Sequence, residues 1–273
     1  MIALTKPRVT LMVLLTAAAG LHLAPQAPPA KVVVVTLLAI GLVVSSANAF
    51  NMWLERDVDA RMARTRNRPL PAARLRPRTA FSVAVVLGLL ALPALAWGAG
   101  LLTAALAALA LVAYVAVYTP MKALSPAALL VGAVPGAIPP VLGWTAATNR
   151  LDPPAIALFA LLFAWQVPHF VAIAVRRKDE YAAAGLRVLP AVHGERVARM
   201  HAAGWAAATL AASWALPALG LGGMAYAATA TLAGGLYVAA TLSRGERWAT
   251  RTFVASLVYL PVVLTALVLD GSR

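Results

Sequence analysis

Long apolar runs recur along the whole chain and restrict what it can fold into. Each has roughly 17 residues or more, enough for an α-helix to cross about 30 Å of hydrocarbon. Because the chain of 273 residues is 62% hydrophobic, no segment remains that could form a separate soluble core. We predict an all-α integral membrane protein, one domain over residues 1–273, with nine transmembrane helices at 9–24, 32–52, 80–98, 101–118, 125–145, 154–175, 201–219, 221–241 and 252–269.

The distribution of basic residues predicts how these spans are oriented. With the N-terminus on the cytoplasmic side, 20 of the 23 Lys and Arg residues fall on that side, and only Lys31, Arg150 and Arg273 fall outside. This asymmetry supports a cytoplasmic N-terminus and an outer C-terminus. It also accounts for the net charge of +14, so we expect no nucleic-acid partner. The first apolar run lacks a convincing cleavage site and is interpreted as a span.

Two cytoplasmic connections, residues 55–79 and 176–200, are much longer than the others and hold most of the polar residues. Loops of this length between packed helices are usually functional, and we expect short helices in them that cap a central cavity. Proline and glycine are dense in the fifth span between Gly132 and Gly143, which predicts that this span lines the cavity.

An acidic stripe begins the first long connection. If the second span continues as a helix, Asn51, Glu55 and Asp59 lie on one face, drifting only about 40° per step. Asp179 has the corresponding place in the second long connection, while Asp57 faces away from the stripe. Clustered carboxylates repel one another unless a cation neutralises them, and Mg²⁺ prefers oxygen ligands that it can bridge to phosphates. The stripe therefore predicts a Mg²⁺ site; the alternative is a charged helix end paired with neighbouring arginines.

Basic and phenolic side chains near the stripe suit a phosphate group. Arg64 and Arg68 follow it in the first long connection, and Tyr118 and Lys122 are spaced i, i+4 at the inner end of the fourth span. Lysine and tyrosine both donate to phosphate oxygens. For the arginines alone, the ordinary basic excess of a cytoplasmic loop is the competing explanation.

The sixth span contains His169, in the run from Trp165 to Phe170. An ionisable group inside a span is by default a candidate functional residue. Two functional interpretations stay open, an axial ligand of a haem iron or a base near a reacting carbon. The structural alternative is a neutral imidazole bonded to a backbone carbonyl that Pro168 leaves free.

Taken in order, these motifs resemble the UbiA-type superfamily of intramembrane prenyltransferases. Within it the chain is most similar to the protohaem IX farnesyltransferase (haem O synthase) family. Glu55 stands where the superfamily usually has Asp. Ala183 stands where it often has a second Asp, which favours the haem-modifying branch over the quinone-type enzymes. The resemblance rests on residues 4–9, 51–70, 118 with 122, 136–144, 165–170 and 178–190.

The resemblance implies a UbiA-type bundle with cytoplasmic cap loops in the cell inner membrane. It implies transfer of a farnesyl group from farnesyl diphosphate to a vinyl group of haem b, with Mg²⁺ as cofactor. The implied catalytic residues are Asn51, Glu55, Asp59, Asp179 and Lys122, of which the first four hold the metal. The implied substrate-binding residues are Arg8, Asp57, Arg64, Arg68, Tyr118, Lys122 and His169.

Membrane lipid surrounds such an enzyme, and a terminal-oxidase assembly protein is a candidate recipient of its product. Two other functions stay open, prenylation of a quinone precursor and transport of haem or another amphiphile. Transporters usually place coupling residues near the bilayer midplane, whereas the charges here gather at one face. This favours the enzyme.

Overall fold

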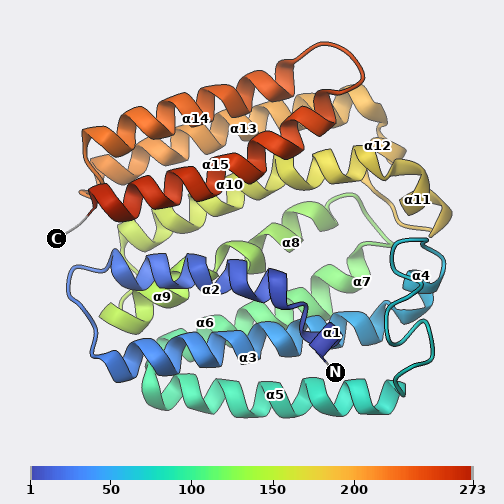
Figure 1. The fold of residues 1–273 in the computed structure, drawn as a ribbon, viewed down its shortest axis with the longest axis horizontal. Coiled ribbons are helices and arrows are strands. Elements are labelled where there is room, and N and C mark those ends of the chain that lie inside the picture. The colour runs from blue at the N-terminus through green and yellow to red at the C-terminus, as the bar shows by residue number, and fades with distance from the viewer. Residues whose placement is uncertain (1, 272–273) are drawn as a thin grey trace.

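The computed structural model describes residues 2–271, which form helices joined by turns, with no strand among them (Figure 1). Arg273, counted above among the outer basic residues, lies outside the described residues. The first half contains α1 (Ile2–Thr5), α2 (Pro7–His22), α3 (Ala30–Leu54), α4 (Arg56–Ala60), α5 (Pro77–Gly98), α6 (Leu101–Val112), the π-helix η1 (Ala113–Tyr118) and α7 (Thr119–Met121). The second contains α8 (Ala128–Ala137), α9 (Pro139–Thr148), α10 (Pro153–Arg176), α11 (Lys178–Ala183), α12 (Leu189–Val192), α13 (Gly194–Ala218), α14 (Met224–Leu242) and α15 (Trp248–Asp270).

All nine predicted spans coincide with helices, but only seven helical segments in residues 2–271 are long and apolar enough to cross a membrane. The two exceptions are α2 and α13. With 16 residues, α2 rises about 24 Å, less than the hydrocarbon thickness. α13 has 25 residues, but charged side chains occupy its first two turns, and its other 18 residues are only weakly apolar because they include His, Gly, Thr, Ser and Pro. A multi-pass membrane protein is therefore supported, and the count of nine stays a prediction.

The long helices run side by side along the longest axis of the molecule (Figure 1). α3 packs against α5, and α2 packs against α9. α14 packs between α13 and α15, and both of these helices also pack against α10. α10 contacts α8 as well. α10 therefore joins α13 and α15 to α8, which packs against η1 in the first half of the chain.

Close packing of α2 on α9 accounts for Gly143 of the fifth span and for Gly20 of its partner. A Cβ on Gly143 would lie 2.0 Å from the Ala17 carbonyl oxygen, and one on Gly20 would lie 2.0 Å from the Pro140 carbonyl oxygen. α2 and α9 can approach this closely only because both positions lack a side chain. The beginning of this span lines the cavity described below, and for the rest of the span the cavity-lining role stays a prediction.

The two long connections form the expected short helices, α4 in the first and α11 and α12 in the second. They lie together at one end of the bundle, opposite the C-terminal end of α15 (Figure 1). The N-terminal segment is fastened beside them, because Leu4 is fully buried in an apolar cluster with Ala49 and Met52 of α3 and Leu70 of the first connection. This end of the bundle holds the candidate site.

Candidate functional site

A cavity of about 270 Å³ lies where the end of α3 meets α4, the end of η1 and the segment between α11 and α12. Its lining contains five basic side chains but only two carboxylates, so it carries an excess of positive charge. A cavity with this balance favours an anionic ligand. The polar residues that line it are Lys6, Asn51, Glu55, Asp59, Arg64, Arg68, Tyr114, Tyr118, Lys122, Ser125, Tyr181 and Arg187.

The acidic stripe lines this cavity although the helix carrying it is interrupted. α3 ends at Leu54 and α4 begins at Arg56. Backbone hydrogen bonds continue across the break: Glu55 N–H donates to the Asn51 carbonyl at 2.9 Å, and Asp59 N–H to the Glu55 carbonyl at 2.7 Å. The i, i+4 spacing is therefore kept, and all three side chains reach the same cavity.

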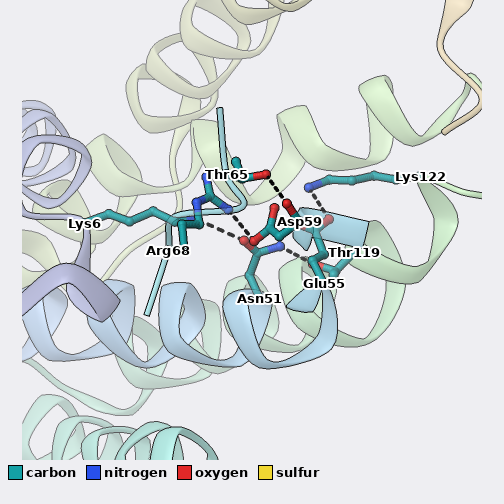
Figure 2. A network of polar contacts seen from close by, with 8 residues as sticks. All are labelled: Lys6, Asn51, Glu55, Asp59, Thr65, Arg68, Thr119 and Lys122. Carbon is teal, nitrogen blue, oxygen red and sulfur yellow. Dashed lines mark hydrogen bonds and ion pairs between the residues drawn. The ribbon is translucent and has the colours of Figure 1, made fainter. Parts of the chain in front are cut away.

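Each oxygen-bearing side chain of the stripe holds one cation (Figure 2). The pairs are Lys6 Nζ to Asn51 Oδ1 at 2.9 Å, Lys122 Nζ to Glu55 Oε1 at 2.7 Å, and Arg68 Nη1 to Asp59 Oδ2 at 2.7 Å. Asp59 is only 1% exposed, and its other oxygen, Oδ1, is buried without a hydrogen-bond partner. An unsatisfied buried carboxylate oxygen is costly, so Asp59 Oδ1 is a position suited to a further ligand.

Contacts behind the stripe hold its members in place. The Asn51 amide Nδ2 donates to Thr119 Oγ1 at 3.3 Å, which directs the amide oxygen toward Lys6. Thr119 in turn donates to the Tyr114 carbonyl at 2.8 Å, and Thr65 Oγ1 donates to the Asp59 carbonyl at 2.8 Å. The amide and the buried carboxylate are thus oriented by the protein itself.

The π-helix η1 turns two phenol rings toward the site. The rings of Tyr114 and Tyr118 lie 5.3 Å apart, and Lys122 Nζ lies 4.5 Å from the centre of the Tyr118 ring. A Cβ on Gly132 would come within 2.4 Å of that ring, so only glycine leaves room for it. Single-turn π-helices of this kind are frequent at functional sites.

The two lysines of the site differ in protonation. Burial, reinforced by the charges of Arg68 and Lys122, lowers the pKa of Lys6 to about 8. Burial acts in the same direction on Lys122, but Tyr118 and Glu55 outweigh it and raise the pKa of Lys122 above its ordinary value. Lys122 is therefore charged throughout the physiological range, whereas Lys6 loses its proton near pH 8.

The second long connection contributes other residues than the sequence predicts. Asp179 is exposed and does not line the cavity, so the structure does not bring it to the stripe. Tyr181 lines the cavity instead, and Glu180 accepts a hydrogen bond from the Arg64 backbone N–H at 3.2 Å. On the short helix α11, positions 179 and 181 are about 200° apart, so they face opposite sides.

The remaining predicted substrate-binding residues divide into two groups. Arg64, Arg68, Tyr118 and Lys122 line the cavity. Arg8 and Asp57 are exposed and do not line it; Asp57 pairs with Arg56 at 3.6 Å.

His169 also lies outside the cavity lining, although its neighbour Phe170 belongs to it. The imidazole is stacked between the rings of Trp165 and Phe253, each with its centre 5.2 Å away. Its Nδ1 lies 2.7 Å from the hydroxyl oxygen of Ser256, which also lies 2.6 Å from the Phe253 carbonyl oxygen. In the tautomer in which Nδ1 donates to Ser256, Nε2 carries the free lone pair. The partner is thus a side chain and not a carbonyl freed by Pro168.

Lys6 and Tyr114 line the cavity, although no sequence motif predicted a role for either. From sequence, Lys6 is only a basic residue of the N-terminal segment. For Tyr114 a signal exists, because Tyr114, Tyr118 and Lys122 repeat the spacing of four that marks the acidic stripe. Among residues 2–271, no group of three or more His, Cys, Asp or Glu side chains is arranged to hold a metal ion. The stripe offers two carboxylates and one amide.

Comparison with known proteins identifies the fold and the family. A family model described as the UbiA prenyltransferase family matches residues 13–267. Similar solved structures include a digeranylgeranylglyceryl phosphate synthase (TM-score 0.85, 14% identity, covering 98% of this chain and 96% of that one). A UbiA homologue from Archaeoglobus fulgidus bound to DMAPP and Mg²⁺ gives a TM-score of 0.70 at 19% identity, covering 97% and 98%. At these identities the likeness shows the fold alone.

Curated relatives are much more similar in sequence. The protoheme IX farnesyltransferase of Anaeromyxobacter sp. (strain Fw109-5) is 52% identical, over 100% of this chain and 93% of the relative. The protein of the same name from Myxococcus xanthus is 46% identical, over 99% and 94%. The family resemblance inferred from the motifs is confirmed: the chain belongs to the UbiA prenyltransferase family.

Proposed function

We propose that this enzyme transfers a farnesyl group from farnesyl diphosphate to a vinyl group of haem b, producing haem O. The names of its relatives support the choice of substrates. One structural observation carries the proposal: a cavity with five cations surrounds a buried carboxylate oxygen that has no partner. This combination suits a diphosphate that arrives together with a divalent cation.

The basic residues of the cavity account for the first chemical step. The allylic C–O bond of the substrate breaks, and its electron pair leaves with the diphosphate. Arg64, Arg68 and Lys122, assisted by the Tyr118 hydroxyl, would donate to the phosphate oxygens and stabilise the charge that develops on them. The haem vinyl group then attacks the farnesyl cation, and water adds to the resulting cation with loss of a proton.

The stripe fits a divalent cation by the chemistry of its donors. Asn51, Glu55 and Asp59 offer only oxygen ligands, and Asp59 Oδ1 is buried without a partner. These three residues would hold Mg²⁺. When bound, Mg²⁺ supplies electrostatic stabilisation of the diphosphate leaving group. Asp179, the fourth ligand expected from the sequence, would reach the site only through a movement of α11.

Apolar side chains also line the cavity. Leu129, Phe170 and Ile173 are part of its lining and would contact the farnesyl chain, which keeps water from the cation. We assign His169 to the haem side, with Nε2 as the atom that meets the iron or accepts a proton. Its position next to Phe170 supports this assignment.

The proposed orientation places the caps in the cytoplasm and the protein in the cell inner membrane. The basic asymmetry of the connections supports it. In accord with it, the N-terminal segment contacts the cap end through Lys6, while α15 ends at the opposite end of the bundle (Figure 1). Farnesyl diphosphate would then enter from the cytoplasm, and a terminal-oxidase assembly protein is the proposed recipient of haem O.

The test is incubation of the purified protein with haem b, Mg²⁺ and farnesyl diphosphate, followed by chromatographic separation of the extracted haems. We expect a farnesylated haem that does not form without Mg²⁺. Farnesylation of an aromatic quinone precursor in place of haem would instead establish the alternative reaction.

A further inference from the structure

Lys6 stands apart from the other cations that contact the stripe. Lys122 and Arg68 each pair with a carboxylate at 2.7 Å. Lys6 donates to the neutral amide oxygen of Asn51 and forms no ion pair within 4.0 Å among residues 2–271. Its charge is therefore not matched by a protein carboxylate in contact with it, which is the condition for attracting an anionic ligand.

The backbone around Lys6 is built to aim this side chain. Lys6 has φ 45° and ψ 65°, a left-handed conformation that is uncommon outside glycine and costs free energy. Its neighbours hold it there. Leu4 is fully buried, and the Thr5 carbonyl accepts hydrogen bonds from Asn48 Nδ2 at 3.3 Å and Thr10 Oγ1 at 2.8 Å. The segment before α2 is thus fastened to α3 with Lys6 directed into the cavity.

We infer that Lys6 is a further substrate-binding residue, which exchanges the Asn51 oxygen for a phosphate oxygen of the prenyl diphosphate. The inference rests on the proposed function. A divalent cation at Asn51 would repel the ammonium group from the amide oxygen. The incoming diphosphate offers the displaced ammonium an oppositely charged partner.

This exchange couples the two ligands. Without the diphosphate, the metal must compete with Lys6 for Asn51 and leaves the ammonium group without a partner. With the diphosphate, that cost disappears. Each ligand therefore strengthens the binding of the other, and by thermodynamic reciprocity both effects have the same size.

The experiment measures Mn²⁺ binding to the purified full chain by electron paramagnetic resonance, with and without farnesyl thiodiphosphate as an unreactive analogue. The variants are Lys6→Met, which keeps the length but not the charge, and Lys6→Arg, which keeps the charge. Lys31→Met is the matched control. Lys31 is an exposed lysine whose ammonium lies 4.0 Å from the Trp97 ring, away from the cavity lining.

We expect Lys6→Met to weaken binding of the analogue in the presence of Mn²⁺ by about 10- to 100-fold, the effect of losing one hydrogen bond to a charged group. Without the analogue, this variant should bind Mn²⁺ at least as tightly as the natural chain. Lys6→Arg should restore most of the analogue affinity, and Lys31→Met should match the natural chain.

Unchanged analogue affinity in Lys6→Met would overturn the inference. A parallel loss of Mn²⁺ and analogue binding would also overturn it, because that pattern indicates a structural role. Both results leave the proposed function standing, provided the natural chain binds the analogue. If the natural chain itself binds neither farnesyl diphosphate nor the analogue, the proposed function fails.

Discussion

The ion pair between Arg68 and Asp59 allows a quantitative test of the site. Its atoms lie 2.7 Å apart, with the Asp59 side chain 1% and the Arg68 side chain 23% exposed. At an effective dielectric constant near 20, the attraction is about 6 kcal/mol, most of which offsets the desolvation of the two charges. Removing one partner of a buried pair costs about 3–5 kcal/mol, and the partial exposure of Arg68 places this pair at the lower end.

We therefore predict that Arg68→Met lowers the free energy of unfolding by about 3 kcal/mol, because it leaves Asp59 charged and unpaired. The double variant with Asp59→Asn should recover about 2 kcal/mol of that loss, since no isolated charge remains. The assay is unfolding by SDS in mixed micelles for both single variants and the double variant.

The exposed pair of Arg56 and Asp57, at 3.6 Å and with side chains 38% and 77% exposed, is the matched control. The same cycle should give a coupling below about 1 kcal/mol there. A coupling as small as this for Arg68 and Asp59 would refute the conclusion that the carboxylate is buried and paired.

Three further predictions concern activity and ligands. Asp59→Asn should lower kcat/KM about 10²-fold or more. The control Glu246→Gln, on an exposed turn, should leave kcat/KM unchanged. Equal kcat/KM values for the two variants would remove Asp59 from the site. Without divalent metal, the affinity for farnesyl diphosphate should fall by up to about tenfold per pH unit above pH 8, because Lys6 then loses the charge that binds the diphosphate. Lys6→Arg should abolish this pH dependence. An unchanged slope of affinity against pH in that variant would contradict the assignment to Lys6. Ser256→Ala should weaken haem b binding about tenfold in absorbance titrations, since His169 loses the hydrogen-bond partner that orients it. Unaltered affinity would return His169 to a structural role.

Hydropathy predicted the helices well where a span is both apolar and continuous. The sixth span, expected at 154–175, is Pro153–Arg176 in the structure. The seventh was expected to begin at residue 201, but α13 begins at Gly194 because charged residues also form helical turns beyond the apolar part. A hydropathy window detects apolar length and cannot place such polar turns.

The acidic stripe could be predicted because its geometry is local. Spacing along one helix determines the relative directions of residues 51, 55 and 59, and the backbone hydrogen bonds keep that spacing across the break at Glu55. The second connection could not be predicted in the same way. The rotation of the six-residue helix α11 is set by tertiary contacts, among them the one from Glu180 to Arg64, so sequence position alone could not decide between Asp179 and Tyr181.

Lys6 was missed for a related reason. Its partner Asn51 is 45 residues away, and the contact depends on how Leu4 and Thr5 dock onto α3. No periodicity connects the two positions. A lone lysine ahead of a span has an ordinary explanation as a topology signal, so the sequence offers no reason to place it in a site.

The most direct test of the site is the position of a divalent cation in the complex with farnesyl thiodiphosphate. An experimental structure with Mn²⁺, located by its anomalous scattering, would measure it. We predict an ion about 2.1 Å from Asp59 Oδ1, with Asn51 and Glu55 as its other protein ligands and with the diphosphate oxygens on its remaining positions. An ion bound away from Asp59, or a diphosphate held at the opposite end of the bundle, would contradict the account.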